Sequence, residues 1–225
     1  MIIVTGASRG LGRDICHRLV TAGHEVFGVA RSVDGLPFPA MSCDVGDYEQ
    51  VKAVARQLKA DKASVTGLIN AAGVAAMNLA VTTPRDTTER VIRINMMGTI
   101  TCCQLLAPLM MRHKSGSIIN FSTIAVALGL KGESIYAGSK AGVEGFSRAF
   151  AREMADFGIR VNCIAPGPID TALLRGITSQ QIEKIVSQQI FPHQFTPAAV
   201  SDIVDLLLDR RSSALSGQVF HVGGV

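Results

Sequence analysis

The sequence opens with Met1-Ile2-Ile3-Val4-Thr5-Gly6-Ala7-Ser8-Arg9-Gly10-Leu11-Gly12. Its apolar residues 2–5 predict a buried strand, and the glycines that follow predict a tight turn into a helix from about Gly10 to Ala22. Glycines at such a turn allow the backbone to approach a phosphate closely, and the start of the helix offers free N–H groups. The spacing Gly-x3-Gly-x-Gly differs from the common dinucleotide pattern Gly-x-Gly-x2-Gly, and a glycine-rich turn can also serve packing alone. Its place after the first strand of an alternating chain favours nucleotide binding.

The rest of the chain continues to alternate short apolar strands with helices. We predict further strands at Glu25–Ala30, Ala40–Cys43, Val65–Ala71, Gly116–Thr123, Ile159–Ala165 and Gln218–Val222, and further helices at Asp47–Ala60, Asp86–Arg112, Ser134–Phe157, Ser179–Gln188 and Pro197–Asp209. The connection Ser32–Pro39 is too short for a full helix. Strands that are hydrophobic on both faces indicate a parallel sheet with helices on each side, so we predict an α/β fold in a single domain, residues 1–225.

The composition argues against several classes of function. The 225 residues are 48% hydrophobic and 18% charged, with a mean hydropathy of +0.31 and a net charge of +4. Because the basic residues are dispersed, we expect no nucleic-acid-binding or membrane-binding face. The apolar balance leaves room for a buried subunit interface, so we expect a homo-oligomer.

The cysteines and the apolar segments indicate the cellular compartment in which the protein is expected. The cysteines are odd in number, lack metal-ligand spacing and lie in apolar segments: Cys16, Cys43, Cys102, Cys103 and Cys163. We expect them to be reduced and buried, with no metal site. The strand pattern from Ile2 leaves no room for a signal peptide, and Ile94–Met111 is broken by Asn95, Gln104 and Pro108, which is typical of a buried helix. These features predict a cytoplasmic protein.

Tyr136 is one of only two tyrosines, and Lys140 follows it four positions later. On a helix, residues four apart share a face, with Cβ atoms about 5–6 Å apart. A lysine ammonium there favours the phenolate, so we expect a tyrosine pKa lowered from about 10 and a proton donor usable near neutral pH. By itself the pair also occurs as a half-buried ring beside a solvated amine.

Five motifs in register resemble those of the short-chain dehydrogenase/reductase family. They are Thr5–Gly12, Asn70-Ala71-Ala72-Gly73, Asn95, Tyr136 with Lys140, and Pro166-Gly167. The match covers essentially the whole chain and implies a Rossmann fold, with a doubly wound seven-stranded parallel sheet, and a nicotinamide cofactor. Ala71 stands where the family usually has a second asparagine and Gly223 where it often has aspartate; both are structural positions in the family.

Cofactor-binding residues follow from this resemblance and from the loops around it. They are Gly6, Ser8, Arg9, Gly10, Leu11, Gly12, Arg31, Asp44, Val45, Asn70, Ala71, Ala72, Gly73, Tyr136, Lys140, Pro166, Gly167, Ile169 and Thr171. In NAD-binding members a carboxylate ends the second strand and holds the ribose 2′-hydroxyl, but Ala30 stands there. Arg31 and Arg9 can instead bind a 2′-phosphate through forked hydrogen bonds. We therefore predict NADP(H), with Asp34 as a nearby carboxylate that opposes the preference.

The resemblance also implies catalytic roles. The family has a hydroxyl-bearing residue thirteen positions before the tyrosine, which is Thr123 here, with Ser122 beside it. A threonine hydroxyl makes the same hydrogen bond to a substrate oxygen, whereas Ser122 faces the other side of a strand unless the backbone twists. Asn95 is implied to position a proton relay to Lys140, which also holds the nicotinamide ribose. The implied reaction is hydride transfer to a carbonyl carbon, with Tyr136 protonating the developing alkoxide.

The substrate side is predicted as a short apolar loop at about residues 168–195. The chain is most similar to 3-oxoacyl-acyl carrier protein reductases, which implies reduction of a 3-oxoacyl thioester or similar ketone. Lys114 lies where such enzymes can bind an acidic carrier, but Phe157 occupies a second, often basic, position, so a free ketone, a CoA thioester or an aromatic polyketide stays open. Alternatives are an epimerase or dehydratase with recycled cofactor, and a cofactor-binding regulatory protein without turnover. By resemblance, the two long helices pair across a two-fold axis in a homodimer or homotetramer.

Overall fold

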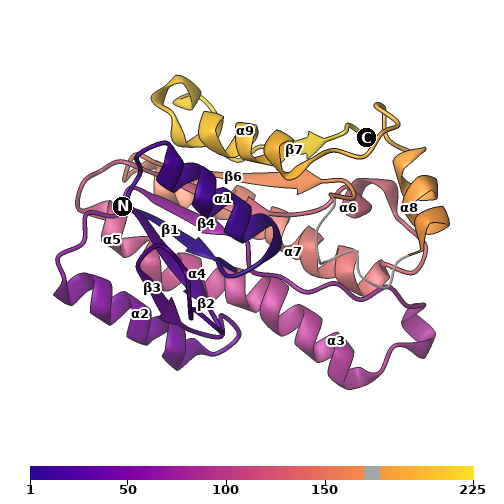
Figure 1. Cartoon of the computed structure of the whole chain (residues 1–225), viewed down its shortest axis with the longest axis horizontal. Coiled ribbons are helices and arrows are strands. Elements are labelled where there is room, and N and C mark those ends of the chain that lie inside the picture. Colours follow the sequence, from indigo (N-terminus) through magenta and orange to yellow (C-terminus); the bar gives the residue numbers. More distant parts are fainter. Residues whose placement is uncertain (170–177) are drawn as a thin grey trace.

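A seven-stranded parallel sheet forms the centre of the molecule (Figure 1). This computed structural model describes residues 1–169 and 178–225. The strands lie in the order β3-β2-β1-β4-β5-β6-β7. Their bounds are Ile2–Thr5 (β1), Val26–Ala30 (β2), Ala40–Ser42 (β3), Gly67–Asn70 (β4), Gly116–Phe121 (β5), Ile159–Pro166 (β6) and Val219–Val222 (β7). The predicted seven-stranded Rossmann fold is confirmed, and the strand ends differ from the predicted ones by no more than two residues.

Helices cover both faces of this sheet. Their bounds are Gly10–Thr21 (α1), Tyr48–Ala60 (α2), Arg85–Ile92 (α3), Gly98–Leu106 (α4), Pro108–Met111 (α5), Ala125–Leu128 (α6), Ser134–Ala155 (α7), Ser179–Val186 (α8) and Pro197–Leu208 (α9). Helices α1 and α9 contribute to one buried apolar cluster, and α2, α4, α5 and α7 contribute to the other. The sheet is therefore doubly wound, as predicted.

Strand β1 shows why the sheet is buried on both sides. Ile2, Ile3 and Val4 are at most 4% exposed. Ile2 and Val4 belong to the cluster beneath α1 and α9, and Ile3 to the cluster on the opposite face. Because alternate side chains of a strand point to opposite faces, a strand between two helical layers needs apolar residues at every position.

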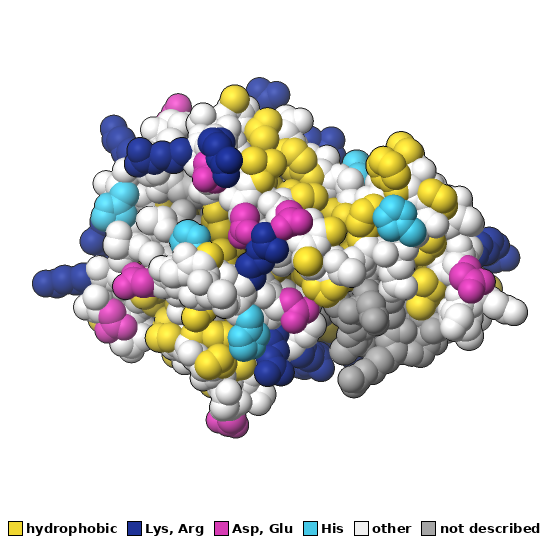
Figure 2. All heavy atoms as spheres, turned by 45° about the horizontal axis from the view of Figure 1, so that its top comes forward, with side chains coloured by type: hydrophobic (Ala, Val, Ile, Leu, Met, Phe, Trp, Pro, Cys, Tyr) yellow, Lys and Arg dark blue, Asp and Glu magenta, His cyan; other side chains and the backbone are white. Residues whose placement is uncertain are grey.

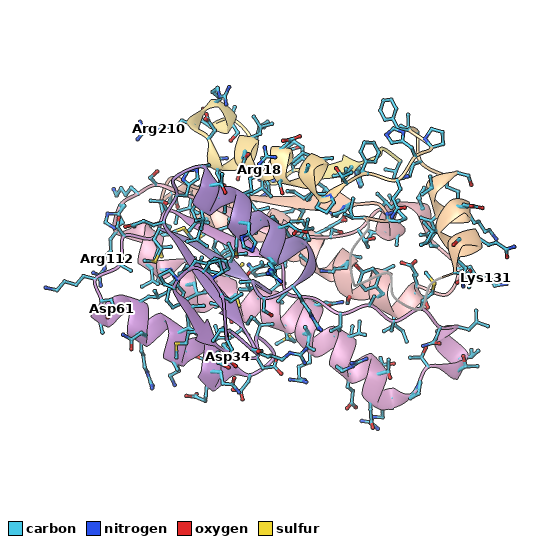
Figure 3. All side chains as sticks on the ribbon, in the orientation of Figure 1. Arg18, Asp34, Asp61, Arg112, Lys131 and Arg210 are labelled. Atoms are coloured by element: carbon cyan, nitrogen blue, oxygen red, sulfur yellow. The ribbon has the colours of Figure 1, made fainter. Side chains whose placement is uncertain are left out.

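The layer formed by α1 and α9 is also joined at its surface. Arg18 of α1 donates hydrogen bonds to Asp202 (2.5 Å) and Asp205 (2.7 Å) of α9, and Figure 3 labels Arg18 between the two helices. The connection from β2 to β3 contains no helix, as predicted. Its Phe38 is buried in the cluster beneath α1.

The helix predicted at Asp86–Arg112 is divided by a π-helical turn, Arg93–Met97, between α3 and α4. The run Arg85–Met111 has a window of mean hydropathy 1.4, so by length and composition alone it is long and apolar enough to cross a membrane. However, 56% of that window is buried within the fold, where α4 and α5 contribute to the core. Its apolar character is thus explained by packing. The π-helical turn carries Asn95, and such turns often mark functional positions.

The cysteines lie in this core. All five are free and buried. Burial raises the pKa of the Cys16 thiol to about 12 and that of Cys43 to about 11, which disfavours the reactive thiolate. Across residues 1–169 and 178–225, no group of three His, Cys, Asp or Glu side chains is arranged to hold a metal ion.

Candidate active site

A cleft of about 800 Å³ opens at the carboxyl ends of the strands. Its lining comes from the glycine loop after β1, the segments after β2 to β6, the start of α7 and one residue of α8. The strand order reverses direction between β1 and β4, because β2 and β3 lie on one side of β1 and the later strands on the other. Open α/β sheets bind ligands at this kind of crevice.

The glycine loop is shaped for close backbone approach. Gly6 has φ +71°, and a Cβ there would lie 2.9 Å from the backbone of Ala72. A Cβ on Gly12 would collide with the carbonyl oxygen of Gly6. The Thr5 hydroxyl accepts a hydrogen bond from the Ala72 N–H (3.1 Å), which holds the loop against the end of β4. These glycines are therefore required by the backbone itself.

The same loop offers an anion site. Helix α1 begins after Arg9 without a side-chain cap and has no acidic residue in its first turn. Its N–H groups are consequently left for an external acceptor, and the helix dipole favours a negative charge there. Ser8, Arg9, Gly10 and Leu11 line the cleft. The loop fits the pyrophosphate of a dinucleotide.

Two predicted arginines belong to the lining of the cleft. Arg9 and Arg31 both line it and are exposed, and neither forms an ion pair within the described part of the chain. Ala30, in the position of the missing carboxylate, is buried. Asp34 also lines the cleft and is labelled in Figure 3. Both predicted arginines and the opposing carboxylate thus line the same cleft.

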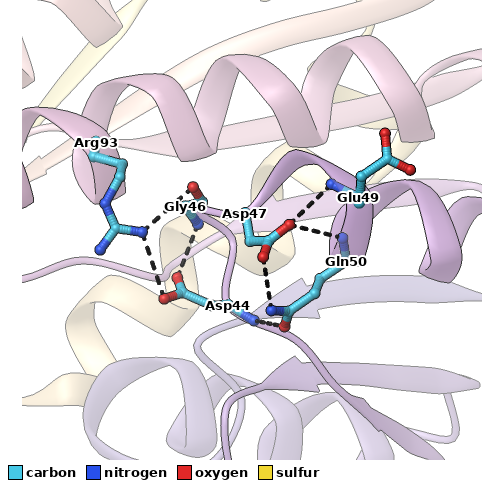
Figure 4. A network of polar contacts seen from close by, with 6 residues as sticks. All are labelled: Asp44, Gly46, Asp47, Glu49, Gln50 and Arg93. Atoms are coloured by element: carbon cyan, nitrogen blue, oxygen red, sulfur yellow. Dashed lines mark hydrogen bonds and ion pairs between the residues drawn. The ribbon is translucent and has the colours of Figure 1, made fainter.

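The loop after β3 is held by a polar network (Figure 4). The Asp44 carboxylate accepts a hydrogen bond from the Gly46 N–H (2.9 Å) and lies 3.7 Å from the Arg93 guanidinium. Asp47 caps α2, and the Gln50 side chain bonds both Asp47 (2.9 Å) and the Asp44 N–H (2.9 Å). Asp44 and Val45 line the cleft, as required of residues that contact an adenine. The network presents them on a fixed loop.

Asn70 lies elsewhere. Its side chain points into the core and donates a hydrogen bond to Asn120 (2.8 Å), which in turn donates to Ser147 of α7 (2.7 Å). Ala71, Ala72 and Gly73 line the cleft, and Asn70 does not. The structure therefore gives the Asn70 side chain a place in the scaffold behind the predicted cofactor-binding backbone.

Asn95 joins three parts of the site from the π-helical turn. It is fully buried, accepts from the Val74 N–H (2.8 Å), and donates to the Val74 carbonyl (2.9 Å) and the Ser139 hydroxyl (3.1 Å). A Cβ on Gly73 would lie 3.3 Å from Asn95 Oδ1 and 3.6 Å from Lys140 Nζ. Gly73 thus marks the place where Asn95 and Lys140 face each other. The absent side chain leaves room there.

Lys140 and Tyr136 are held differently from expectation. Lys140 is 4% exposed and donates to the Phe121 carbonyl (2.8 Å), and burial lowers its pKa to about 8. The pKa of Tyr136 is raised, first by burial and then by the nearby Glu133 carboxylate, while a hydrogen bond with Thr123 lowers it. The predicted net lowering of the Tyr136 pKa is therefore wrong: the pKa is raised. Desolvation penalises the phenolate more than the polar neighbours stabilise it.

The two hydroxyl residues after β5 face different partners. Thr123 is buried and lines the cleft together with Tyr136, and its hydroxyl accepts a hydrogen bond from the Ala125 N–H (3.2 Å). The Ser122 hydroxyl instead donates to Glu144 of α7 (2.5 Å), whose carboxylate also lies 3.5 Å from Arg148. Ser122, named as a catalytic candidate from sequence, is engaged away from Tyr136. Glu144 was missed, although it lies one helical turn after Lys140 on the same face of α7.

The segment after β6 completes the cleft. Pro166, Gly167 and Ile169 line it, whereas Thr171 lies outside the described residues. Within the predicted substrate loop, α8 contributes Ile185 to the lining. Sequence reasoning also missed Glu133, a buried carboxylate in the cleft three residues before Tyr136.

Comparison with known proteins identifies the family of this chain. Residues 1–182 match the family model of the short chain dehydrogenases, and the chain belongs to this family. The 3-oxoacyl-[acyl-carrier-protein] reductase FabG of Staphylococcus aureus is 31% identical over 235 residues, covering 99% of this chain and 96% of that protein. FabG of Salmonella typhimurium is 31% identical over 231 residues, with 99% and 95% covered. The ligand-free structure of Thermoplasma acidophilum aldohexose dehydrogenase has a TM-score of 0.89 and 29% identity, with 99% and 92% covered.

The family assignment fixes the general chemistry. The protein is an oxidoreductase of the short-chain family, whose members bind a nicotinamide cofactor. The chain spans nearly the full length of the relatives it matches.

Proposed function

We propose that this protein reduces a ketone to a secondary alcohol with NADPH, using Tyr136 as the proton donor. The observation that carries the proposal is that one cleft brings Tyr136, Thr123 and Lys140 beside the glycine loop. The 31% identity to FabG proteins supports a 3-oxoacyl thioester or a similar carbonyl compound as the substrate.

The protein's own groups support the proton transfer. A bound nicotinamide supplies the hydride. Because the Tyr136 pKa is raised, its hydroxyl stays protonated at neutral pH and can donate to a developing alkoxide. Thr123 hydrogen-bonds the substrate oxygen, and Lys140, which is charged below about pH 8, stabilises the phenolate that results. Asn95 holds the loop and helix that flank Lys140.

The preference for NADPH rests on the two arginines that line the cleft. Arg31 and Arg9 are exposed there and suit a 2′-phosphate. Arg31→Asp should raise the KM for NADPH sharply and improve the use of NADH. An unchanged cofactor preference in this variant would show that Arg31 has another role.

The reaction is tested by NADPH oxidation against acetoacetyl thioesters of CoA and of acyl carrier protein, and against free ketones. Tyr136→Phe should abolish turnover while NADPH affinity is retained. Tyr48→Phe is the matched control, because the other tyrosine is 50% exposed on α2. Substantial activity of Tyr136→Phe would refute the scheme. Substrate conversion with a tightly held cofactor and no net NADPH consumption would indicate an epimerase or dehydratase. Cofactor binding without any turnover would indicate a regulatory protein.

We further propose a cytoplasmic homodimer or homotetramer in which the helical segment from α3 to α5 and helix α7 pair with their copies across a two-fold axis. Small residues are exposed along one face of α7 at helical spacing: Gly138, Ala141, Gly145 and Ala149. No atom lies within 4 Å of a Cβ placed on Gly138 or Gly145, so a second helix can approach closely. Apolar side chains are also exposed over the face that carries α9 (Figure 2), where Leu206 is 41% exposed. We also propose that an acyl carrier protein, if it delivers the substrate, docks near Lys114.

A further inference from the structure

Glu133 is a carboxylate in the cleft that the proposed reaction does not use. It immediately precedes α7, three residues before Tyr136, and is 8% exposed. Although it stands at the N-cap position, its side chain caps no N–H group of the helix. Within residues 1–169 and 178–225 its carboxyl oxygens have neither a hydrogen bond nor an ion pair. Among the described residues, the buried side-chain oxygens without a partner belong to Asn70 and Gln189, and not to Glu133, so the Glu133 carboxyl group is accessible from the cleft that it lines.

The surroundings of Glu133 are apolar. Its N–H donates to the carbonyl of Leu130 (3.2 Å), and the Met77 side chain lies 3.9 Å from the Cβ position of neighbouring Gly132. Leu130 and Met77 line the cleft with Glu133. Glu133 lines the same cleft as Tyr136 and lies three residues before it in the chain, and burial raises the pKa of the Glu133 carboxyl group. The cleft therefore holds an acceptor close to its proton donor.

The polar side chains in this part of the cleft include both hydrogen-bond donors and a hydrogen-bond acceptor. The hydroxyls of Tyr136 and Thr123 donate to a carbonyl oxygen, but a simple ketone has no hydrogen to offer Glu133. A substrate that satisfies all three must carry a donor beside its carbonyl. A substrate carboxylate or phosphate at the same place would meet like charge and lose its own hydration.

We propose that Glu133 is a specificity-determining residue that accepts a hydrogen bond from a substrate hydroxyl near the reacting carbonyl, so that the enzyme prefers hydroxyketones over apolar ketones and over keto acids. This inference rests on the proposed ketone reduction and narrows its substrate class, so that a 3-oxoacyl thioester would need a hydroxyl near the reacting carbonyl to be preferred. A hydrogen bond to a buried acceptor rejects the analogue that lacks the donor, because the acceptor is then left unpaired.

The test uses pairs of ketones that differ only by hydroxyl against methyl, at three distances from the carbonyl. The pairs are hydroxyacetone with butanone, 4-hydroxy-2-butanone with 2-pentanone, and 5-hydroxy-2-pentanone with 2-hexanone; levulinate is the anionic probe. Values of kcat/KM are compared for the wild type, Glu133→Gln and Glu133→Leu. Glu153→Leu is the matched control, because Glu153 is exposed on α7.

The wild type should favour the hydroxyl member of at least one pair by about tenfold or more. Glu133→Leu should lose this preference, and Glu133→Gln should retain part of it through its amide oxygen. Both variants should use levulinate better relative to 2-hexanone, because both lack the negative charge. Glu153→Leu should match the wild type in every ratio. A merely structural role of Glu133 would change stability and leave these ratios unmoved.

The same ketones are also titrated calorimetrically into the protein with NADP⁺, which has no hydride for ketone reduction, and absorbance at 340 nm is monitored to show that the hydroxyl groups are not oxidised. These dissociation constants decide the role of Glu133 even if no ketone is turned over, in which case the proposed reduction fails separately. Tighter binding of a hydroxyketone that is lost in Glu133→Leu supports the inference. It is overturned if the wild type shows no hydroxyl preference in either measurement, or if Glu133→Leu keeps the wild-type ratio.

Discussion

Replacing the buried lysine of the cleft, Lys140→Met, should change how stability depends on pH. Lys140 is 4% exposed, and its only hydrogen-bond acceptor among the described residues is the Phe121 carbonyl, at 2.8 Å. Its pKa falls from 10.5 to about 8 on folding. The unfolded chain therefore binds this proton more tightly than the folded protein does. The charged amine opposes folding, and methionine of similar length removes that charge.

The magnitude follows from the pKa. At about 1.4 kcal/mol per pH unit, a pKa lowered from 10.5 to about 8 corresponds to about 3 kcal/mol of unfolding free energy. Below pH 8 both states hold the proton, and the wild type carries the whole penalty. Between pH 8 and 10.5 only the unfolded state holds it, so wild-type stability gains with rising pH. Loss of the bond to Phe121 costs the variant about 1–3 kcal/mol at every pH.

The assay is urea unfolding of both proteins at intervals from about pH 7 to about pH 10. The stability of Lys140→Met relative to the wild type should be constant below about pH 8 and then fall by about 2–3 kcal/mol toward pH 10. Lys59→Met, at an exposed position of α2, should show no such change. A difference between Lys140→Met and the wild type that is independent of pH would refute the argument that burial holds the lysine pKa low.

Three further substitutions address the scaffold. Ser122→Ala should lower the unfolding free energy by about 2 kcal/mol, because it removes a hydrogen-bond donor from the Glu144 carboxylate. Activity well below the melting temperature should persist. Lost activity at unchanged stability would instead indicate that the Ser122 hydroxyl contacts the substrate. Gly12→Ala should abolish NADPH binding in a fluorescence titration, because the new Cβ collides with the Gly6 carbonyl, and unchanged affinity would contradict the shape of the loop. Gly145→Leu should shift the assembly toward folded monomers in light scattering, and an unchanged mass would exclude this face of α7 as the interface.

Much of the fold was open to sequence reasoning because it depends on local patterns. Residues 2–5 predict a strand with its observed ends, since an apolar run bounded by glycine has few other structures. The end of α2 at Ala60 is likewise as predicted. The four-residue helix α6 was missed, because Ala125–Leu128 is too short to show helical periodicity. The π-helical turn at Arg93–Met97 was not predicted, because the bond between Asn95 and the Val74 N–H joins residues far apart in sequence.

The division between sequence and tertiary structure is clearest in the site itself. The sequence alone determined the order of strands and helices, the glycine loop, and the pairing of Tyr136 with Lys140, because these follow from spacing along one chain. Tertiary structure decided the direction of the Tyr136 pKa, since burial and the Glu133 charge outweigh a lysine that bonds to Phe121. It also decided that Thr123 lines the cleft together with Tyr136, while the Ser122 hydroxyl donates to Glu144 of α7. Desolvation and side-chain direction depend on atoms that folding brings together, so they cannot be predicted from residue spacing in the sequence.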